Sequence, residues 1–158
     1  MKQYLDALQY ILDNGEDVSD RTGVGTRTVF GHQMRFSLQD SFPAVTTKRL
    51  AWKSVVSELL WFLEGGTDER RLAEILFEKD RSELTDKNTI WTANADAQGV
   101  ALGYRNDDEH KFLGPVYGSQ WRHWGGFDQI ETIIDQLKND LDSRRIILSA
   151  WNVAEVPD

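Results

Sequence analysis

Apolar residues recur at helical spacing in two widely separated parts of the chain. Residues 2–14 place their apolar side chains three and four positions apart, and Gly15 follows as a C-terminal stop. Residues 127–137 show the same periodicity. Between them, Thr67 stands where it can cap a shorter helix over 68–77. We expect helices at all these places, and the longer ones need a core on which to pack their apolar stripes.

The segment 52–63 has a different pattern, because apolar residues occupy nearly every side of the helix that it would form. Gly65 and Gly66 end the run, so the pattern predicts a buried helix. Glu58 lies inside it. A carboxylate in such surroundings is costly without hydrogen-bond partners, which makes Glu58 a candidate general acid or base. The alternative is a structural carboxylate bonded to the backbone or to an arginine.

Two segments have the pattern of β-strands. Residues 27–38 carry apolar side chains on one face of a period-2 segment, and 146–151 is a short apolar run. Residues 78–111 are mostly polar but contain recurring aromatic residues, which favours an irregular insertion over a linker. Because the elements lack regular βαβ spacing, the pattern predicts an α+β fold in a single domain over 1–158.

Composition narrows the class of protein. At 158 residues, 40% of them hydrophobic, the chain has enough apolar surface to build one core. A formal charge of -8 argues against a nucleic-acid-binding protein. The chain has no cysteine and its 3 histidines are scattered, so we expect no metal site. No apolar run approaches the length of a membrane span and the start lacks a signal-peptide segment, so we expect a cytoplasmic protein.

Basic residues beside glycines and before a predicted strand are candidate anion sites. Arg21 opens a loop with Gly23 and Gly25, where the backbone can approach an oxyanion such as phosphate; a plain tight turn is the alternative. Arg144 and Arg145 stand directly before the second predicted strand. Adjacent charges there suit an anion or a partner subunit, and a solvated strand entrance is the alternative.

Two aromatic residues are candidate ligand contacts. Trp91 and Tyr117 stand beside glycine or polar neighbours and not in apolar stripes, as expected for rings offered to a ligand. Ordinary core aromatics are the alternative. The pattern alone leaves both interpretations open for each ring.

Five separated segments resemble the thymidylate synthase family. They are DRTGVGT at 20–26, FPAVTTKR at 42–49, ELLWFL at 58–63, LGPVYG at 113–118 and DSRRIILSAWN at 142–152. They occur in the family's order and, with the first four residues, span essentially the whole chain. The resemblance implies the family's α+β fold, a mixed sheet with packed helices, here incomplete at the C-terminal end.

The resemblance also implies an activity and its partners. Members of the family convert deoxyuridine monophosphate (dUMP) to deoxythymidine monophosphate (dTMP). They use 5,10-methylenetetrahydrofolate as one-carbon donor and reductant, without a metal, and work as homodimers. By that similarity we expect dUMP and the folate cosubstrate as ligands and a second copy of the chain as partner, with no nucleic acid and no membrane.

Roles for the nucleotide site follow from the same similarity. Glu58 would organise the water network that moves protons, and Tyr117 would lie beside the nucleophile and the pyrimidine carbon that is methylated. Arg21 would hold the nucleotide phosphate. Arg144 and Arg145 would reach across the dimer to the phosphate bound by the other subunit.

For the folate, the similarity implies that Lys48 meets the distal, anionic end while Ile90 and Trp91 pack on the ring system. Two positions depart from the family pattern. Thr92 stands where Asp commonly follows the tryptophan, and Ala51 replaces a His found in many members near the folate. Both changes bear on the folate contacts and not on the phosphate contacts.

The family's nucleophile is a cysteine thiolate, which adds to the pyrimidine ring and activates it. This chain contains no cysteine, and the segment that carries the nucleophile in the family would follow Asp158. We therefore expect the chain to be inactive alone and to need a C-terminal half, covalently attached or as a separate chain. The alternatives are a non-catalytic nucleotide-binding or dimerisation module and a nonfunctional fragment.

Overall fold

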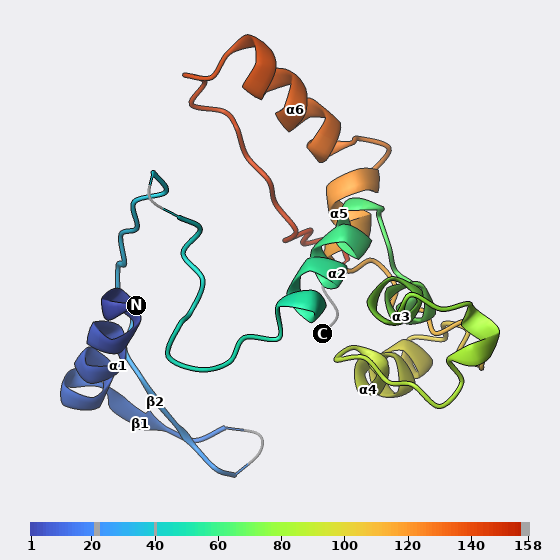
Figure 1. Cartoon of the computed structure of the whole chain (residues 1–158), viewed down its shortest axis with the longest axis horizontal. Coiled ribbons are helices and arrows are strands. Elements are labelled where there is room, and N and C mark those ends of the chain that lie inside the picture. Colours follow the sequence, from blue (N-terminus) through green and yellow to red (C-terminus); the bar gives the residue numbers. More distant parts are fainter. Residues whose placement is uncertain (21–22, 40, 156–158) are drawn as a thin grey trace. The chain divides into compact units, whose positions relative to one another are not determined.

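The computed structural model describes residues 1–20, 23–39 and 41–155 (Figure 1). The chain divides into two compact units, Met1–Ala51 and Trp52–Asp158. A single domain over 1–158, with residues 78–111 as an irregular insertion, stays a prediction.

The first unit is a helix followed by a short hairpin. Helix α1 (Lys2–Asn14) confirms the helix expected there, and β1 (Glu16–Val18) pairs antiparallel with β2 (Thr26–Thr28). Gly15 joins α1 to β1. A Cβ atom at this position would lie 2.5 Å from the carbonyl oxygen of Ile11, so the close approach of helix and hairpin requires glycine.

The prediction of a strand over 27–38 is wrong beyond its first residues. β2 ends at Thr28, and residues 29–38 have no regular secondary structure. Phe30, which the alternating pattern assigned to one face of the strand, is fully exposed. A strand is stable through ladder hydrogen bonds to a neighbour. Within the described residues β1 has 3 residues, so the pairing ends with it.

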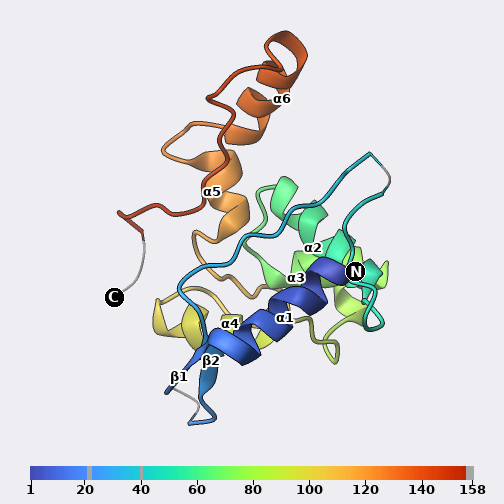
Figure 2. The ribbon, with the colours of Figure 1, turned by 90° about the vertical axis from the view of Figure 1, so that its left-hand side faces the viewer.

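The second unit contains four of the longer helices. Helix α2 (Trp52–Leu63) contacts α3 (Glu69–Phe77) and α5 (Tyr117–His123), and α6 (Gln129–Asn139) follows α5 (Figures 1 and 2). The helices expected over 52–63, 68–77 and 127–137 are therefore confirmed within two residues at their ends, whereas α5 was not expected from the sequence. Their shared core is a cluster of buried apolar side chains: Trp61, Phe62, Leu72, Ala95 and Leu113.

Short helical turns connect α3 to α5. They are η1 (Arg81–Glu83), α4 (Thr92–Asn94) and η2 (Ala95–Gly99). Ala95 belongs to the core, so this connection is packed against the helices. The aromatic side chain of Trp91, which precedes α4, also packs on the core.

Helix α2 is less buried than its sequence predicts. Trp61 and Phe62 face the core, whereas Trp52, Leu59 and Leu60 are each about half exposed. An apolar helix surface of this kind costs free energy in water. Helix α2 thus presents one apolar face to the core and a second to solvent in the described chain.

The cap of α3 differs from the expected one. Asp68, and not Thr67, is the N-cap, and its carboxylate accepts a hydrogen bond of 3.1 Å from the backbone N–H of Arg70. Thr67 lies one residue outside the helix, where its carbonyl accepts the N–H of Leu113 at 2.9 Å. Asp and Thr both serve as N-caps, and the pairing with Leu113 decides between them.

The strand predicted over 146–151 is not formed. The amide of Gln129 takes the place of a neighbouring strand, since it accepts the N–H of Ser149 at 2.9 Å and donates to the Ser149 carbonyl at 2.8 Å. A side-chain amide can satisfy one residue of a ladder and cannot extend it. The segment therefore meets the start of α6 at Ser149 without strand geometry.

The α+β class is confirmed by the helices and the small sheet, together with the structural relative described below. Across the described parts of the chain, none of the helices combines the length and apolar character needed to cross a membrane.

Candidate active site

Glu58 and Trp91 form a hydrogen-bonded pair. Glu58 lies on α2, 33 residues before Trp91, and the indole Nε1–H of Trp91 donates to Glu58 Oε1 at 2.6 Å. Both side chains are half-buried. No protein group in the described chain bonds the second carboxylate oxygen, Oε2, so it is free to accept a proton or a water. The lone carboxylate in an apolar helix thus has the partner that its position requires.

Tyr117 completes an aromatic corner beside this pair. Its ring lies edge-on to Trp91 with centroids 6.2 Å apart, and edge-on to Phe62 at 5.3 Å. Such edge-to-face contacts are favourable and fix the orientation of a ring. Tyr117 is 48% exposed, so its outer face remains open to a ligand.

The start of α5 is held close to the turn after α2. A Cβ atom at Gly118 would lie 2.7 Å from the carbonyl oxygen of Gly66, a distance that no real side chain tolerates. Glycine at position 118 therefore permits the contact that brings Tyr117 against Phe62.

A buried ion pair lies at the start of α3. Glu69 is 0% exposed and Arg70 2%, and the guanidinium donates to both carboxylate oxygens, at 2.7 Å and 2.9 Å. Two further N–H groups of Arg70 bond the carbonyls of Leu84, at 2.8 Å, and Lys87, at 2.9 Å. Each guanidinium nitrogen and each carboxylate oxygen of the pair thus has a hydrogen-bond partner, as buried charges need in order to be tolerated.

The segment before α4 is tied to that ion pair through two threonines. The hydroxyls of Thr89 and Thr92 donate to Glu69 Oε1 at 2.7 Å and 2.6 Å. Thr89 Oγ1 also accepts the backbone N–H of Trp91 at 3.2 Å, and Thr92 Oγ1 accepts that of Thr89 at 2.8 Å. The side chain of Thr92 is therefore a buried structural hydroxyl.

Asp68, next to the ion pair, is the centre of a second group of charged and polar contacts. Burial opposes its ionisation, but hydrogen bonds from the Lys111 backbone and the His110 ring, and the charge of Arg81, outweigh burial and lower its pKa. The contacts with Arg81 and His110 measure 2.8 Å and 2.9 Å. Asp68 thereby clamps residues 110–111 to the start of α3.

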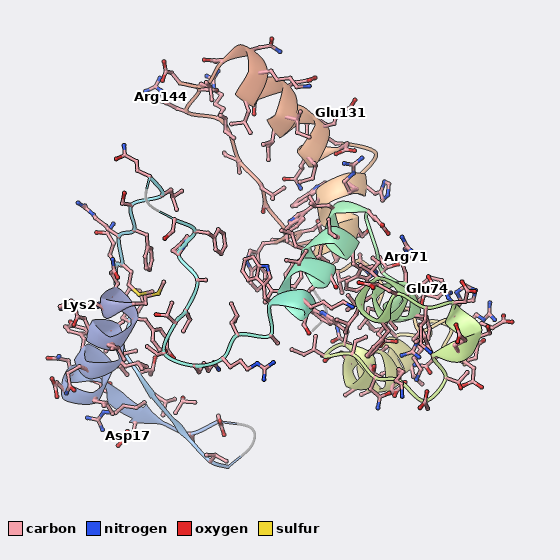
Figure 3. All side chains as sticks on the ribbon, in the orientation of Figure 1. Lys2, Asp17, Arg71, Glu74, Glu131 and Arg144 are labelled. Carbon is pink, nitrogen blue, oxygen red and sulfur yellow. The ribbon has the colours of Figure 1, made fainter. Side chains whose placement is uncertain are left out.

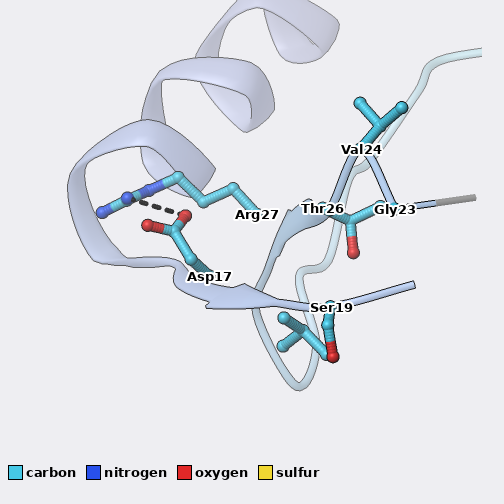
Figure 4. Close-up of a pocket in the computed structure, with 8 residues that line it drawn as sticks. Asp17, Ser19, Gly23, Val24, Thr26 and Arg27 are labelled. Atoms are coloured by element: carbon cyan, nitrogen blue, oxygen red, sulfur yellow. Dashed lines mark hydrogen bonds and ion pairs between the residues drawn. The ribbon is translucent and has the colours of Figure 1, made fainter.

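The glycine loop of the first unit forms a pocket of about 380 Å³ (Figure 4). Gly23 and Gly25 adopt positive φ values of 75° and 81°, which glycine tolerates best. Arg27 at its edge is paired with Asp17 at 3.1 Å. Arg21, the predicted phosphate ligand of this loop, lies outside the described residues.

The other predicted residues are exposed. Lys48 lies in the first unit, and Ile90 is 79% exposed beside Trp91. Arg144 and Arg145 lie in the turn beyond α6, where Figure 3 labels Arg144. Neither guanidinium has a hydrogen-bond or ion-pair partner within the described residues. The structure thus brings Glu58, Trp91 and Tyr117 together and leaves Lys48, Arg144 and Arg145 at the surface.

Sequence reasoning missed Glu69 and Arg70. Adjacent opposite charges in the first turn of a helix are typical of a solvated surface, and periodicity gives no sign that they are buried. The two threonines of the segment TIWT, one on either side of Ile90-Trp91, were the available signal, because such hydroxyls need an acceptor when buried.

The fold and the site define an α+β protein with a carboxylate and aromatic rings gathered at a partly open surface. The family model described as thymidylate synthase matches residues 2–158. The chain belongs to the thymidylate synthase family.

Individual relatives agree with this assignment. A probable thymidylate synthase of Escherichia phage T5 is 49% identical over 156 residues, which cover 99% of this chain and 53% of the relative. The crystal structure of thymidylate synthase from T4 phage matches with a TM-score of 0.86 and 46% identity, over 98% of this chain and 51% of that one. This chain therefore spans about half the length of the relatives that it matches.

Proposed function

We propose that this chain provides one half of a thymidylate synthase active site, which methylates dUMP to dTMP with 5,10-methylenetetrahydrofolate. The observation that carries the proposal is the contact of Glu58 with Trp91 beside the open face of Tyr117. These residues come from three segments, and Glu58 and Tyr117 lie in two of the segments that resemble the family, 58–63 and 113–118.

In this proposal Glu58 handles protons. Its Oε1 is held by the Trp91 indole, which fixes the carboxylate, while Oε2 faces no protein partner in the described chain and can hold a water or a proton. A positioned carboxylate of this kind acts as a general acid or base. Tyr117 would place the exposed part of its ring beside the pyrimidine.

The phosphate of dUMP would be bound by arginines. Arg21 would act within its own subunit, and Arg144 and Arg145 would reach the nucleotide of the partner in a homodimer. The latter two are exposed and have no side-chain partner among the described residues, which supports a role toward a group outside this chain. Arginine suits such a role because its planar fork binds phosphate oxygens in pairs.

The folate would lie on Ile90 and Trp91, with its anionic end toward Lys48. The side chain of Ile90 is exposed beside the indole, so apolar surface is available for a flat ring system. When bound, the folate supplies the one-carbon unit and the reducing hydride. The chain's own residues would exclude water from one face of that ring system and orient it.

The thiolate nucleophile would have to come from a C-terminal half, because this chain has no cysteine. That half would be attached covalently or bind as a separate chain. The isolated chain would then make no dTMP. A cytoplasmic location is part of the same proposal.

The test is complementation. Chain 1–158 is combined with the C-terminal half of the phage T5 relative, and release of tritium from labelled dUMP is measured with folate present. We expect no release from either half alone and release from the combination. Glu58→Gln should lower kcat by about a hundredfold or more. A folded, complete assembly that binds dUMP without turnover would instead support a non-catalytic nucleotide-binding module.

A further inference from the structure

Burying the ion pair of Glu69 and Arg70 costs desolvation free energy, which is a large term for so small a unit. Two charges removed from water cost free energy that their attraction alone does not reliably recover. Here the two side chains are almost completely buried, and each nitrogen of the guanidinium donates to an acceptor. A solvated surface pair would serve the stability of α3 as well, so the buried pair requires another explanation.

That explanation is the path of hydrogen bonds that leaves Glu69. Its Oε1 accepts the hydroxyl of Thr89 at 2.7 Å, and Thr89 Oγ1 in turn accepts the backbone N–H of Trp91 at 3.2 Å. The indole of Trp91 then donates to Glu58 at 2.6 Å. At each step of this path an O–H or N–H group donates and an oxygen atom accepts. A buried carboxylate on α3 is thus connected to the half-buried carboxylate on α2.

Thr92 fixes the same turn from its other side. Its hydroxyl donates to Glu69 at 2.6 Å and accepts the backbone N–H of Thr89 at 2.8 Å. A carboxylate at position 92 could not donate, and it would add a second negative charge beside Glu69 in a buried place. The hydroxyl of Thr92 and the carboxylate of Glu69 are therefore a chemically matched pair.

We propose that Glu69 is a positioning residue for the active site: through Thr89 and Thr92 it sets the backbone of Trp91, and thereby aims the indole at Glu58. The relevance of this arrangement for catalysis rests on the proposed function, in which Glu58 handles protons. The arrangement itself is testable without turnover.

The test observes the indole N–H of Trp91 by nuclear magnetic resonance, with the signal assigned through Trp91→Phe. Thr89→Val and Thr92→Val remove each hydroxyl while keeping the shape of the side chain. We expect either variant to shift the Trp91 signal and to speed exchange of its proton about tenfold, since the bond to Glu58 is no longer held. Thr89→Ser and Thr92→Ser keep the hydroxyl and should restore both properties.

The matched control is Gln129→Ala, which removes a buried side chain of α6 whose hydrogen bonds go to Gln120 and Ser149 and have no part in the path. It should lower the melting temperature while leaving the Trp91 signal in place. An unmoved signal in the valine variants, or an equal shift in Gln129→Ala, would overturn the proposal. If Thr92→Val does not fold, Thr89→Val decides, because Thr89 is half-buried and its loss is milder.

If the isolated chain gives no dispersed indole signals, the same spectra are recorded in complex with the C-terminal half. Turnover of that complex separates the two claims. A shifted Trp91 signal with an assembly that never makes dTMP would leave the positioning role standing and reject the proposed function. If the assembly is active and the Trp91 signal does not shift in either valine variant, the positioning role alone is rejected.

Discussion

The second unit contains two groups of charges that the structure treats in opposite ways. Around the start of α3, Arg70 and Glu69 are buried and their hydrogen bonds are made within the unit. Beyond α6, Arg144 and Arg145 are exposed, and their guanidinium groups contact nothing in the described chain. The first group is complete by itself, whereas the second offers its donors to a partner or ligand.

The apolar side chains of the two regions differ in the same way. Leu72 and Leu84, near the buried pair, are almost inaccessible, whereas Ile147 and Trp151, after the exposed arginines, are largely open to water. Exposed large apolar residues that follow one another in this way are typical of surfaces that bind another chain. The comparison teaches that the charged and apolar groups from α3 to α4 are satisfied within the unit, whereas the region after α6 leaves both kinds of group open to solvent.

The largest effect should come from breaking the buried pair. Arg70→Met leaves the carboxylate of Glu69 buried without its cation, and we expect the free energy of unfolding to fall by about 3 to 5 kcal/mol. Urea unfolding of the purified chain measures it. The double variant Arg70→Met/Glu69→Leu should lose less, because no charge remains buried. A single-variant loss below about 1 kcal/mol would mean that water reaches the pair.

Removing the exposed pair Arg144 and Arg145 should leave stability almost unchanged and weaken nucleotide binding. Arg144→Ala/Arg145→Ala should change the unfolding free energy by less than about 0.5 kcal/mol, as for surface residues without partners. In the complete assembly, dUMP affinity should fall at least about tenfold, since charge-assisted hydrogen bonds are lost. Calorimetry measures the affinity.

Mixed dimers show where the pair acts. Combining the arginine double variant with a subunit that carries Arg21→Ala should regenerate one intact site if Arg144 and Arg145 act across the dimer. Activity no higher than in either parent would place the pair in its own subunit, or leave it as a solvated turn.

The contrast between the two regions also explains what could be predicted from the sequence. Helices α1, α2 and α6 follow from local periodicity, because each apolar stripe is encoded within its own segment. The strand at 146–151 fails, since a strand depends on a neighbour that the local pattern does not specify. Among the site residues, Glu58 stood out by its isolation in an apolar helix, whereas its contact with Trp91 joins segments 33 residues apart. No periodicity reports such a contact.

The contribution of Asp68 should depend on pH. Its pKa is lowered in the folded chain, so the stability it supplies is present above the ordinary aspartate pKa near 4 and is lost as the pH falls through the folded value. Asp68→Asn keeps the capping geometry and removes the charge opposite Arg81 and His110. The variant should be less stable by about 1 to 2 kcal/mol at pH 6.

Urea unfolding midpoints measured between pH 3 and 7 report this difference in stability. The midpoints of parent and Asp68→Asn should approach each other as the pH falls. The matched control is Asp142→Asn, an exposed carboxylate in the turn beyond α6. Substitution of this exposed side chain should change the unfolding free energy by less than about 0.5 kcal/mol. Parallel curves for Asp68→Asn would show that hydrogen bonding alone, without charge, makes the clamp.

The smallest effect on stability should come from the exposed apolar residues after α6. Ile147→Ser removes a side chain that is 67% exposed, so the unfolding free energy of the isolated chain should change by less than about 0.5 kcal/mol. Binding of the C-terminal half should weaken much more, by roughly tenfold, because the residue would become buried there. Fluorescence titration of the two halves measures it, with Leu141→Ser as a control on the preceding turn. If neither Ile147→Ser nor Leu141→Ser weakens binding of the C-terminal half, the apolar residues after α6 do not contact that half. In that case only the proposed role of Arg144 and Arg145 toward the nucleotide would remain for this region.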